Sequence, residues 1–186
     1  MTKFVWKRGI AALVGVGCAI LMALSATPAA ARPWKSTPAM LAQDYTQIID
    51  SRPNHQIVMV WWIPSLIEQS SESRDILDKY VVVGIVDAQV SDLGIFTFTP
   101  VQTLSVNADG KPLHLLTAAD TPPGVASFLT FMQSAMTRAV GQVGAGLHWF
   151  AFSAGTFRPC GSGQLSIPYA GEVYTYDAPI PGCPKS

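Results

Sequence analysis

Residues 56–63 read Gln-Ile-Val-Met-Val-Trp-Trp-Ile, and residues 81–86 read Val-Val-Val-Gly-Ile-Val. Each is an apolar run bounded by turn residues and too short for a buried helix, which indicates a strand covered on both faces. Between them, Ser65 and Glu68 form a capping-box pattern that predicts a helix over residues 65–79. Strand, helix and strand in this order are typical of a βαβ unit, so we expect the two strands to be parallel.

Two further helices are expected to cover this sheet. Thr37-Pro38 is a cap residue followed by proline, and the apolar side chains after it recur at helical spacing, which predicts a helix over residues 37–50. Residues 125–140 carry a broad apolar face and predict the second helix. Gly141, Gly144 and Gly146 follow it as terminators.

The remaining strands are expected to be antiparallel. Alternating apolar side chains and a turn at Asn107-Ala108-Asp109-Gly110 predict a hairpin. The fold class expected is therefore mixed α/β (α+β), with a central parallel pair extended by antiparallel strands, helices packed on the sheet and a β-rich C-terminal extension. The additional strands are predicted at residues 96–99, 101–106, 112–116, 147–152, 165–169 and 172–176.

Composition bounds the possible functions. The chain has 186 residues, of which 49% are hydrophobic and 13% are charged, as expected for one globular domain. Basic and acidic residues are balanced at 12 each. This balance offers no positive surface for nucleic acid.

Residues 1–31 have the three parts of a secretory signal peptide. Lys3, Lys7 and Arg8 precede an uncharged apolar stretch that ends in Ala29-Ala30-Ala31. We therefore expect cleavage after Ala31, export to the periplasm or medium, and a single mature domain over residues 32–186 with no membrane span. A retained N-terminal anchor is the alternative, because the apolar stretch approaches the length of a spanning helix.

Cleavage would leave two cysteines, Cys160 and Cys183. Disulfides form and persist in exported proteins, so we expect these two to be bonded. A redox function is not expected, because redox cysteines usually lie two residues apart at a helix start. The bond would hold the β-rich C-terminal region together.

No local motif indicates an enzyme, a cofactor or a metal site. His55, His114 and His148 are far apart in the chain, with no ligand pair beside them. Asp87 ends a buried strand, where α/β sheets place ligand-contacting residues, but a turn cap before Ala88-Gln89 is the favoured interpretation. Asp87, His114 and His148 are the weak catalytic candidates.

Aromatic residues are the most unusual feature. Neighbouring residues of a strand point to opposite faces, so Trp61 and Trp62 cannot fill the same core layer, and the second could pack under a helix or line a groove. Core positions are favoured for this pair. The C-terminal segment 147–186 concentrates further aromatic side chains that would form a partner-binding surface if exposed. The candidate surface residues are Trp149, Tyr169, Tyr174 and Tyr176.

The order of the predicted elements resembles the thioredoxin-like arrangement. In that family a cis-proline precedes the third core strand, and Pro100 occupies a comparable place. The family's two cysteines would fall near residues 65–68, where this chain has none. Residues 87–100 are also short for the family's middle helix, and the segment 147–186 has no counterpart. The resemblance implies a fold and no oxidoreductase activity.

Two functions follow as hypotheses. The favoured one is an exported, non-catalytic domain that binds a protein or an envelope component. The alternative is a small secreted hydrolase whose catalytic groups converge only in the fold. Convergence of His114, His148 and Asp87 in one cleft would favour the enzyme, and their separation would favour binding.

Overall fold

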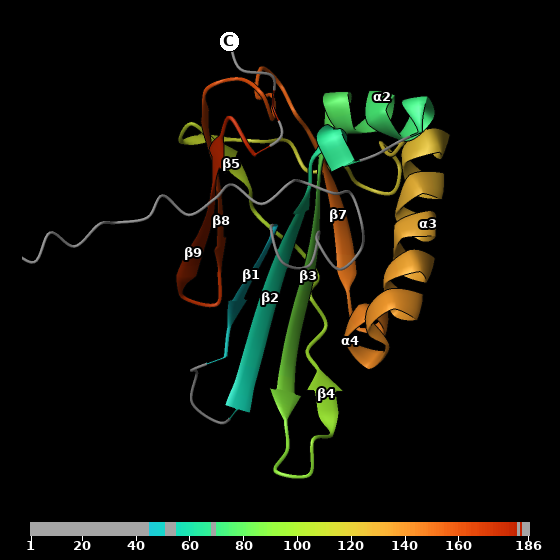
Figure 1. The fold of residues 1–186 in the computed structure, drawn as a ribbon, viewed down its shortest axis with the longest axis vertical. Coiled ribbons are helices and arrows are strands. Elements are labelled where there is room, and N and C mark those ends of the chain that lie inside the picture. The colour runs from blue at the N-terminus through green and yellow to red at the C-terminus, as the bar shows by residue number, and fades with distance from the viewer. Residues whose placement is uncertain (1–44, 51–54, 68–69, 182, 184–186) are drawn as a thin grey trace, which may run out of the picture. The chain divides into compact units, whose positions relative to one another are not determined.

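The computed structural model describes residues 45–50, 55–67, 70–181 and 183. In this part of the chain nine strands form two sheets, and every pairing between strands is antiparallel (Figure 1). The first sheet contains β1 (Thr46–Ile49), β2 (Gln56–Ile63), β3 (Tyr80–Val90), β4 (Phe96–Phe98) and β7 (His148–Ser153).

The long strand β3 is the centre of the first sheet. It pairs with β2 on one side. On its other side the first half of β3 pairs with β7 and its last three residues pair with β4. Residues 81–88 of β3 are all buried, as the apolar run at 81–86 predicts.

The predicted parallel pair is wrong, because β2 and β3 are antiparallel neighbours with Val60 opposite Ile85. The connection explains the reversal. Helix α2 (Ser71–Lys79) has nine residues and rises about 14 Å, whereas the eight residues of β2 span about 26 Å. The helix is too short to return the chain to the start of β2, so β3 begins at the end where β2 stops (Figure 1).

The expected thioredoxin-like arrangement is also wrong, because it requires the parallel pair that the structure does not contain in its described part. Its expected cis-proline is also absent at Pro100: among the described residues, the cis peptide bond precedes Pro179. The predicted capping box does not start the helix either. Residues 65–67 form a short 3-10 helix, η2, and the hydroxyl of Ser70 caps α2 by accepting a hydrogen bond from the Ser73 backbone N–H.

The predicted helix over residues 37–50 is wrong where it can be compared. Residues 46–49 form β1, which pairs with residues 58–61 of β2, whereas residues 37–44 lie outside the described part. Thr and Ile are β-branched and suit a strand. Residues 46–49 form backbone hydrogen bonds with the edge of β2. The spacing of apolar residues along the sequence does not show that this partner is available.

The C-terminal strands agree better with prediction. β8 (Gly163–Tyr169) and β9 (Glu172–Ala178) form the antiparallel core of the second sheet, with Ile167 opposite Tyr174. The predicted hairpin at 107–110 is present, but its strands β5 (Asn107–Ala108) and β6 (Lys111–Pro112) are two residues long. No strand forms over 101–106. The sheet order is β6-β5-β8-β9.

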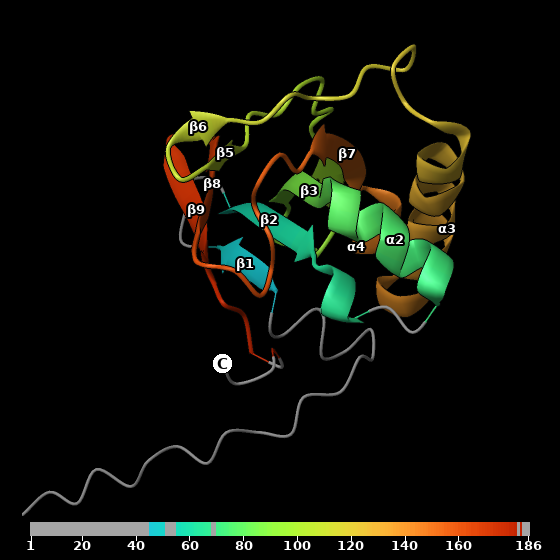
Figure 2. The ribbon, with the colours of Figure 1, turned by 90° about the horizontal axis from the view of Figure 1, so that it is seen from above.

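The first sheet is covered on both faces, as its apolar runs require. Figure 2 shows α2 and α3 (Pro123–Val140) on one side of it and the second sheet on the other. We call these sides the helix face, which includes Trp61, Gly84 and Trp149, and the inner face, which includes Trp62. The short helix α4 (Gln142–Ala145) joins α3 to β7.

Both tryptophans of β2 are core residues, as predicted. Each is 1% exposed. Trp62 packs on the inner face between Phe157 and Tyr176, with ring centroids 5.6 Å from each. Trp61 lies on the helix face, in register with Gly84. A methyl group at Gly84 would lie 2.7 Å from the Trp149 ring, so glycine is required for the two strands to carry these indoles.

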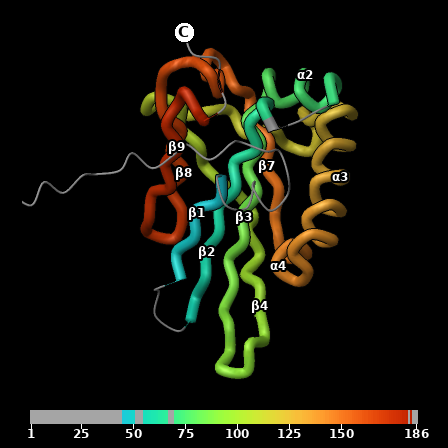
Figure 3. The backbone as a smooth tube through the Cα atoms, viewed as in Figure 1, coloured from blue at the N-terminus to red at the C-terminus, as the bar shows by residue number. Residues whose placement is uncertain are grey.

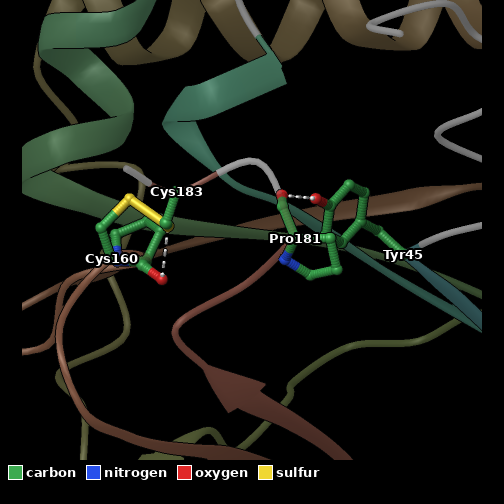
Figure 4. The surroundings of a disulfide bond; sticks show 5 residues. Tyr45, Cys160, Pro181 and Cys183 are labelled. Atoms are coloured by element: carbon green, nitrogen blue, oxygen red, sulfur yellow. Dashed lines mark hydrogen bonds between the residues drawn. A yellow bond between two sulfur atoms is a disulfide. The ribbon is translucent and has the colours of Figure 1, made fainter. Parts of the chain in front are cut away.

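The predicted disulfide is present between Cys160 and Cys183 (Figure 4). It encloses β8 and β9. Beside it, the hydroxyl of Tyr45 donates a hydrogen bond of 3.3 Å to the carbonyl of Pro181. The C-terminal segment is thus tied both to the start of β8 and to the residue that precedes β1.

Candidate functional site

The turn between β3 and β4 exposes two large aliphatic side chains. Leu93 is 86% exposed and Ile95 is 61% exposed. Figure 3 shows this turn extending past the ends of the neighbouring strands. Most large aliphatic residues of a folded chain lie inside. We call residues 91–95 the hairpin tip.

Backbone hydrogen bonds hold the tip in one conformation. The N–H of Ser91 donates to the carbonyl of Ile95 at 2.9 Å, and the N–H of Gly94 donates to the carbonyl of Ser91 at 2.8 Å. The Ser91 hydroxyl accepts a further bond from the Ile95 N–H. Gly94 has φ of +75°, a conformation that favours glycine. The apolar side chains are therefore presented on an ordered turn.

The base of the hairpin is anchored to the rest of the fold. The rings of Phe96 and Phe98 stack, with centroids 6.0 Å apart and planes within 8°. Phe98 also lies against Gly146, where a Cβ atom would overlap its ring. The tip is thus connected through stacked aromatic side chains to the junction of α4 and β7.

An open pocket of about 450 Å³ lies beside the tip. His55 and Asp92 approach each other at its edge, with Nε2 and Oδ1 3.5 Å apart, and both side chains are largely exposed. The side of the tip is therefore polar while its end is apolar. Other residues that line this pocket are Gln89, Ser91 and Thr97.

Asp87 is 5% exposed, and both of its carboxylate oxygens accept hydrogen bonds. Gln56 Nε2 donates to Oδ1 at 2.8 Å, and the Tyr169 hydroxyl donates to Oδ2 at 2.9 Å. These bonds connect β2, β3 and β8, and so join the two sheets. Gln56 and Tyr169 thus give each oxygen of this buried carboxyl group a hydrogen-bond donor. Asp87 lies within β3 and does not cap a turn, and its carboxyl group links the two sheets.

The two histidine candidates are not brought together. His148 is the first residue of β7 and lies opposite Ile85 of β3. His114 is exposed, and its carbonyl accepts a hydrogen bond from Ser153, at the other end of β7. Five positions along a strand correspond to about 17 Å. Among the described residues, no hydrogen bond joins either histidine to Asp87.

The predicted aromatic surface lies largely inside the protein. Tyr174 is 1% exposed and Tyr176 is 8% exposed. Tyr169 and Trp149 are half-buried. The tyrosines alternate along β8 and β9 so that they face the first sheet, where they pack between the two sheets. The exposed apolar side chains at the hairpin tip lie instead where the sequence raised no candidate.

Burial has a chemical consequence for Tyr176. Its hydroxyl lies 2.7 Å from the Val60 carbonyl and 2.9 Å from the Tyr45 carbonyl. Burial raises the pKa of Tyr176 well above its ordinary value, because the phenolate would lose its hydration. The neutral phenol is therefore the form that the fold stabilises.

Alkaline pH should destabilise the protein through Tyr176. The unfolded chain ionises this tyrosine near pH 10 while the folded chain does not, so stability present below pH 10 is lost as pH rises. Between pH 9 and 11 this loss should be about 1.4 kcal/mol. Urea unfolding should show that the Tyr176→Phe variant is less stable than the unmodified protein at pH 8. Its free energy of unfolding should fall less than that of the unmodified protein as the pH rises from 9 to 11. Equal losses in both proteins would contradict this assignment.

The part of the chain that the structure describes can also be compared with the requirements of a metal cluster and of a membrane-spanning helix. No three His, Cys, Asp or Glu side chains gather there closely enough to hold a metal ion. None of its helices combines the length and the apolar character needed to cross a bilayer.

Comparisons with known proteins give no relative from which to transfer a function. No protein-family model, curated protein sequence or solved structure matches the chain. The geometry of its own side chains is therefore the basis for inferring function.

Proposed function

We propose that the protein is an exported, non-catalytic binding domain that engages an apolar site on a protein of the cell envelope or medium through its hairpin tip. The observation that carries this proposal is the exposure of Leu93 and Ile95 on an ordered turn. Burying one such side chain contributes about 1.5–3 kcal/mol. An ordered turn loses little conformational entropy on binding.

Export is supported by two independent features. Residues 1–31 have the pattern of a signal peptide. The mature chain would retain two cysteines, and these form a disulfide, as is typical of exported proteins. Protein recovered outside the cytoplasm should begin at Arg32 when its N-terminus is sequenced.

The alternative of a secreted hydrolase has less support. Its three candidates do not all converge: His114 lies at the far end of β7 from His148, and both carboxyl oxygens of Asp87 already accept hydrogen bonds. An acid–base pair must reach the same reacting atom. This separation favours binding over catalysis.

Site-specific photo-crosslinking tests the proposal. A photoreactive residue introduced as Leu93→p-benzoylphenylalanine in the full-length chain should give a discrete cross-linked product with one envelope or secreted protein. Adding Ile95→Ser should remove that product. In equilibrium binding to the identified partner, the pair Leu93→Ser and Ile95→Ser should weaken affinity about 100-fold, which corresponds to about 3 kcal/mol.

Val173 provides the matched control. It is 61% exposed, like Ile95, but lies on β9 in the second sheet. The photoreactive residue at Val173 should not give the same product, and Val173→Ser should leave affinity unchanged. An identical cross-link at both positions, or none at Leu93, would overturn the proposal.

A further inference from the structure

A groove separates α2 from the first half of α3. It consists of two adjoining hollows of about 430 and 170 Å³, which share Glu72, Ile76 and Gly124. The larger hollow has the size of sites that hold small ligands or single side chains. Glycine at position 124 leaves this space open, since a Cβ atom there would lie 3.8 Å from the Ile76 side chain.

The floor and one rim of this groove are apolar. Ile76 is half-buried beside Gly124, and Val125 and Phe128 of α3 close the bottom. Phe131 stands at the rim and is 55% exposed, although it lies only three residues from the buried Phe128. An exposed aromatic beside a hollow is a suitable contact for an apolar side chain.

The wall formed by α2 is acidic. Glu72 and Asp75 are three residues apart, so they lie on the same side of the helix. Neither has an ion pair among the described residues. Of the lining residues that the structure describes, Lys79 is the basic one, and it lines the larger hollow only. Helix α3 does not neutralise these two carboxylates. Its single charged residue is Arg138, which lies near its C-terminal end, whereas the groove is lined by its first half.

We infer that this groove is a second binding site, which takes a peptide segment of a protein partner that carries a basic residue next to a bulky apolar residue. The basic side chain pairs with Glu72 and Asp75, and the apolar side chain packs on Ile76 and Phe131. Charge complementarity selects this occupant, because an acidic segment would be repelled by the same carboxylates. A second copy of the chain is a poorer occupant. If its hairpin tip entered the groove, Asp92 of the tip would approach Glu72, and the two carboxylates would repel each other.

This site is separate from the hairpin tip. Figure 1 shows α2 and the start of α3 at one end of the first sheet and the turn between β3 and β4 at the other. The inference therefore does not depend on the function proposed for the tip. With both sites occupied, the protein would bridge two partners.

Peptide selection tests the inference. A phage-displayed library of random peptides is selected on the immobilised, disulfide-bonded mature protein, and the most enriched peptide is synthesised and titrated by calorimetry. Enriched peptides should combine Lys or Arg with a large apolar residue. The pair Glu72→Gln and Asp75→Asn should weaken binding tenfold or more, as should Phe131→Ser, and added salt should weaken binding to the unmodified protein.

Asp78→Asn is the matched control, because Asp78 is an exposed carboxylate of α2 outside the groove lining. It should leave affinity within twofold. Peptide-induced amide shifts in the unmodified protein should concentrate at residues 71–80 and 124–131, a readout that needs no variant. Enrichment of peptides without basic residues, shifts centred elsewhere, or equal effects of Asp78→Asn and the paired groove variants would overturn the inference.

Discussion

Replacement of Trp62 with alanine should lower the free energy of unfolding by about 3–5 kcal/mol, the range for removing a large aromatic side chain from a core. Trp62 is 1% exposed. Its ring contacts Phe157 and Tyr176 at centroid distances of 5.6 Å and Tyr45 at 6.4 Å. The substitution would therefore leave a cavity between the two sheets that these rings can fill only in part.

Urea unfolding followed by circular dichroism measures this loss. Phe131→Ala is the control, since that ring is 55% exposed on α3 and its removal should cost less than about 1 kcal/mol. A comparable loss from both substitutions would mean that the two sheets do not pack through Trp62.

Removal of the disulfide should cost about 3 kcal/mol on the loop-entropy estimate. The bond joins residues 23 positions apart, and closing a loop of this size restricts the unfolded chain by about that amount. The enclosed segment contains β8 and β9, which supply Tyr174 and Tyr176 to the core between the sheets. Loss of the bond should therefore loosen the second sheet first.

Two preparations test this prediction. The double variant Cys160→Ala and Cys183→Ala and the mature protein kept under a reducing agent should both unfold at lower urea concentration than the oxidised protein, by the same amount. Thiol titration of the oxidised, unfolded protein should find no free thiol. Two free thiols, or equal stability with and without the reducing agent, would contradict the prediction.

Elements with a strong local pattern could be predicted from the sequence. The apolar runs at β2 and β3, the amphipathic face of α3 and the strands predicted at 165–169 and 172–176 each match an element of the structure within a few residues. The disulfide followed from having two cysteines in the expected mature chain. In each case residues close together in the chain, or a simple count, carry the information.

Strand direction and partner choice required the tertiary structure. An apolar run has the same pattern whether its neighbour is parallel or antiparallel, and the turning of the chain depends on the length of α2 and on where it packs. Residues 46–49 have side chains compatible with a helix or a strand. Pairing with β2 decided between them.

The candidate sites show the same division. Aromatic side chains are visibly concentrated near the C-terminus of the sequence, and a strand over residues 172–176 puts Tyr174 and Tyr176 on one face. That this face is buried depends on the packing of the two sheets, because the second sheet covers the side of the first sheet away from the helices. Leu93 and Ile95 lie next to the turn residues Ser91, Asp92 and Gly94, which is a local signal for exposure. Their significance appeared only once the fold showed that no other described element covers them, since burial is a property of the whole chain's packing and not of any segment.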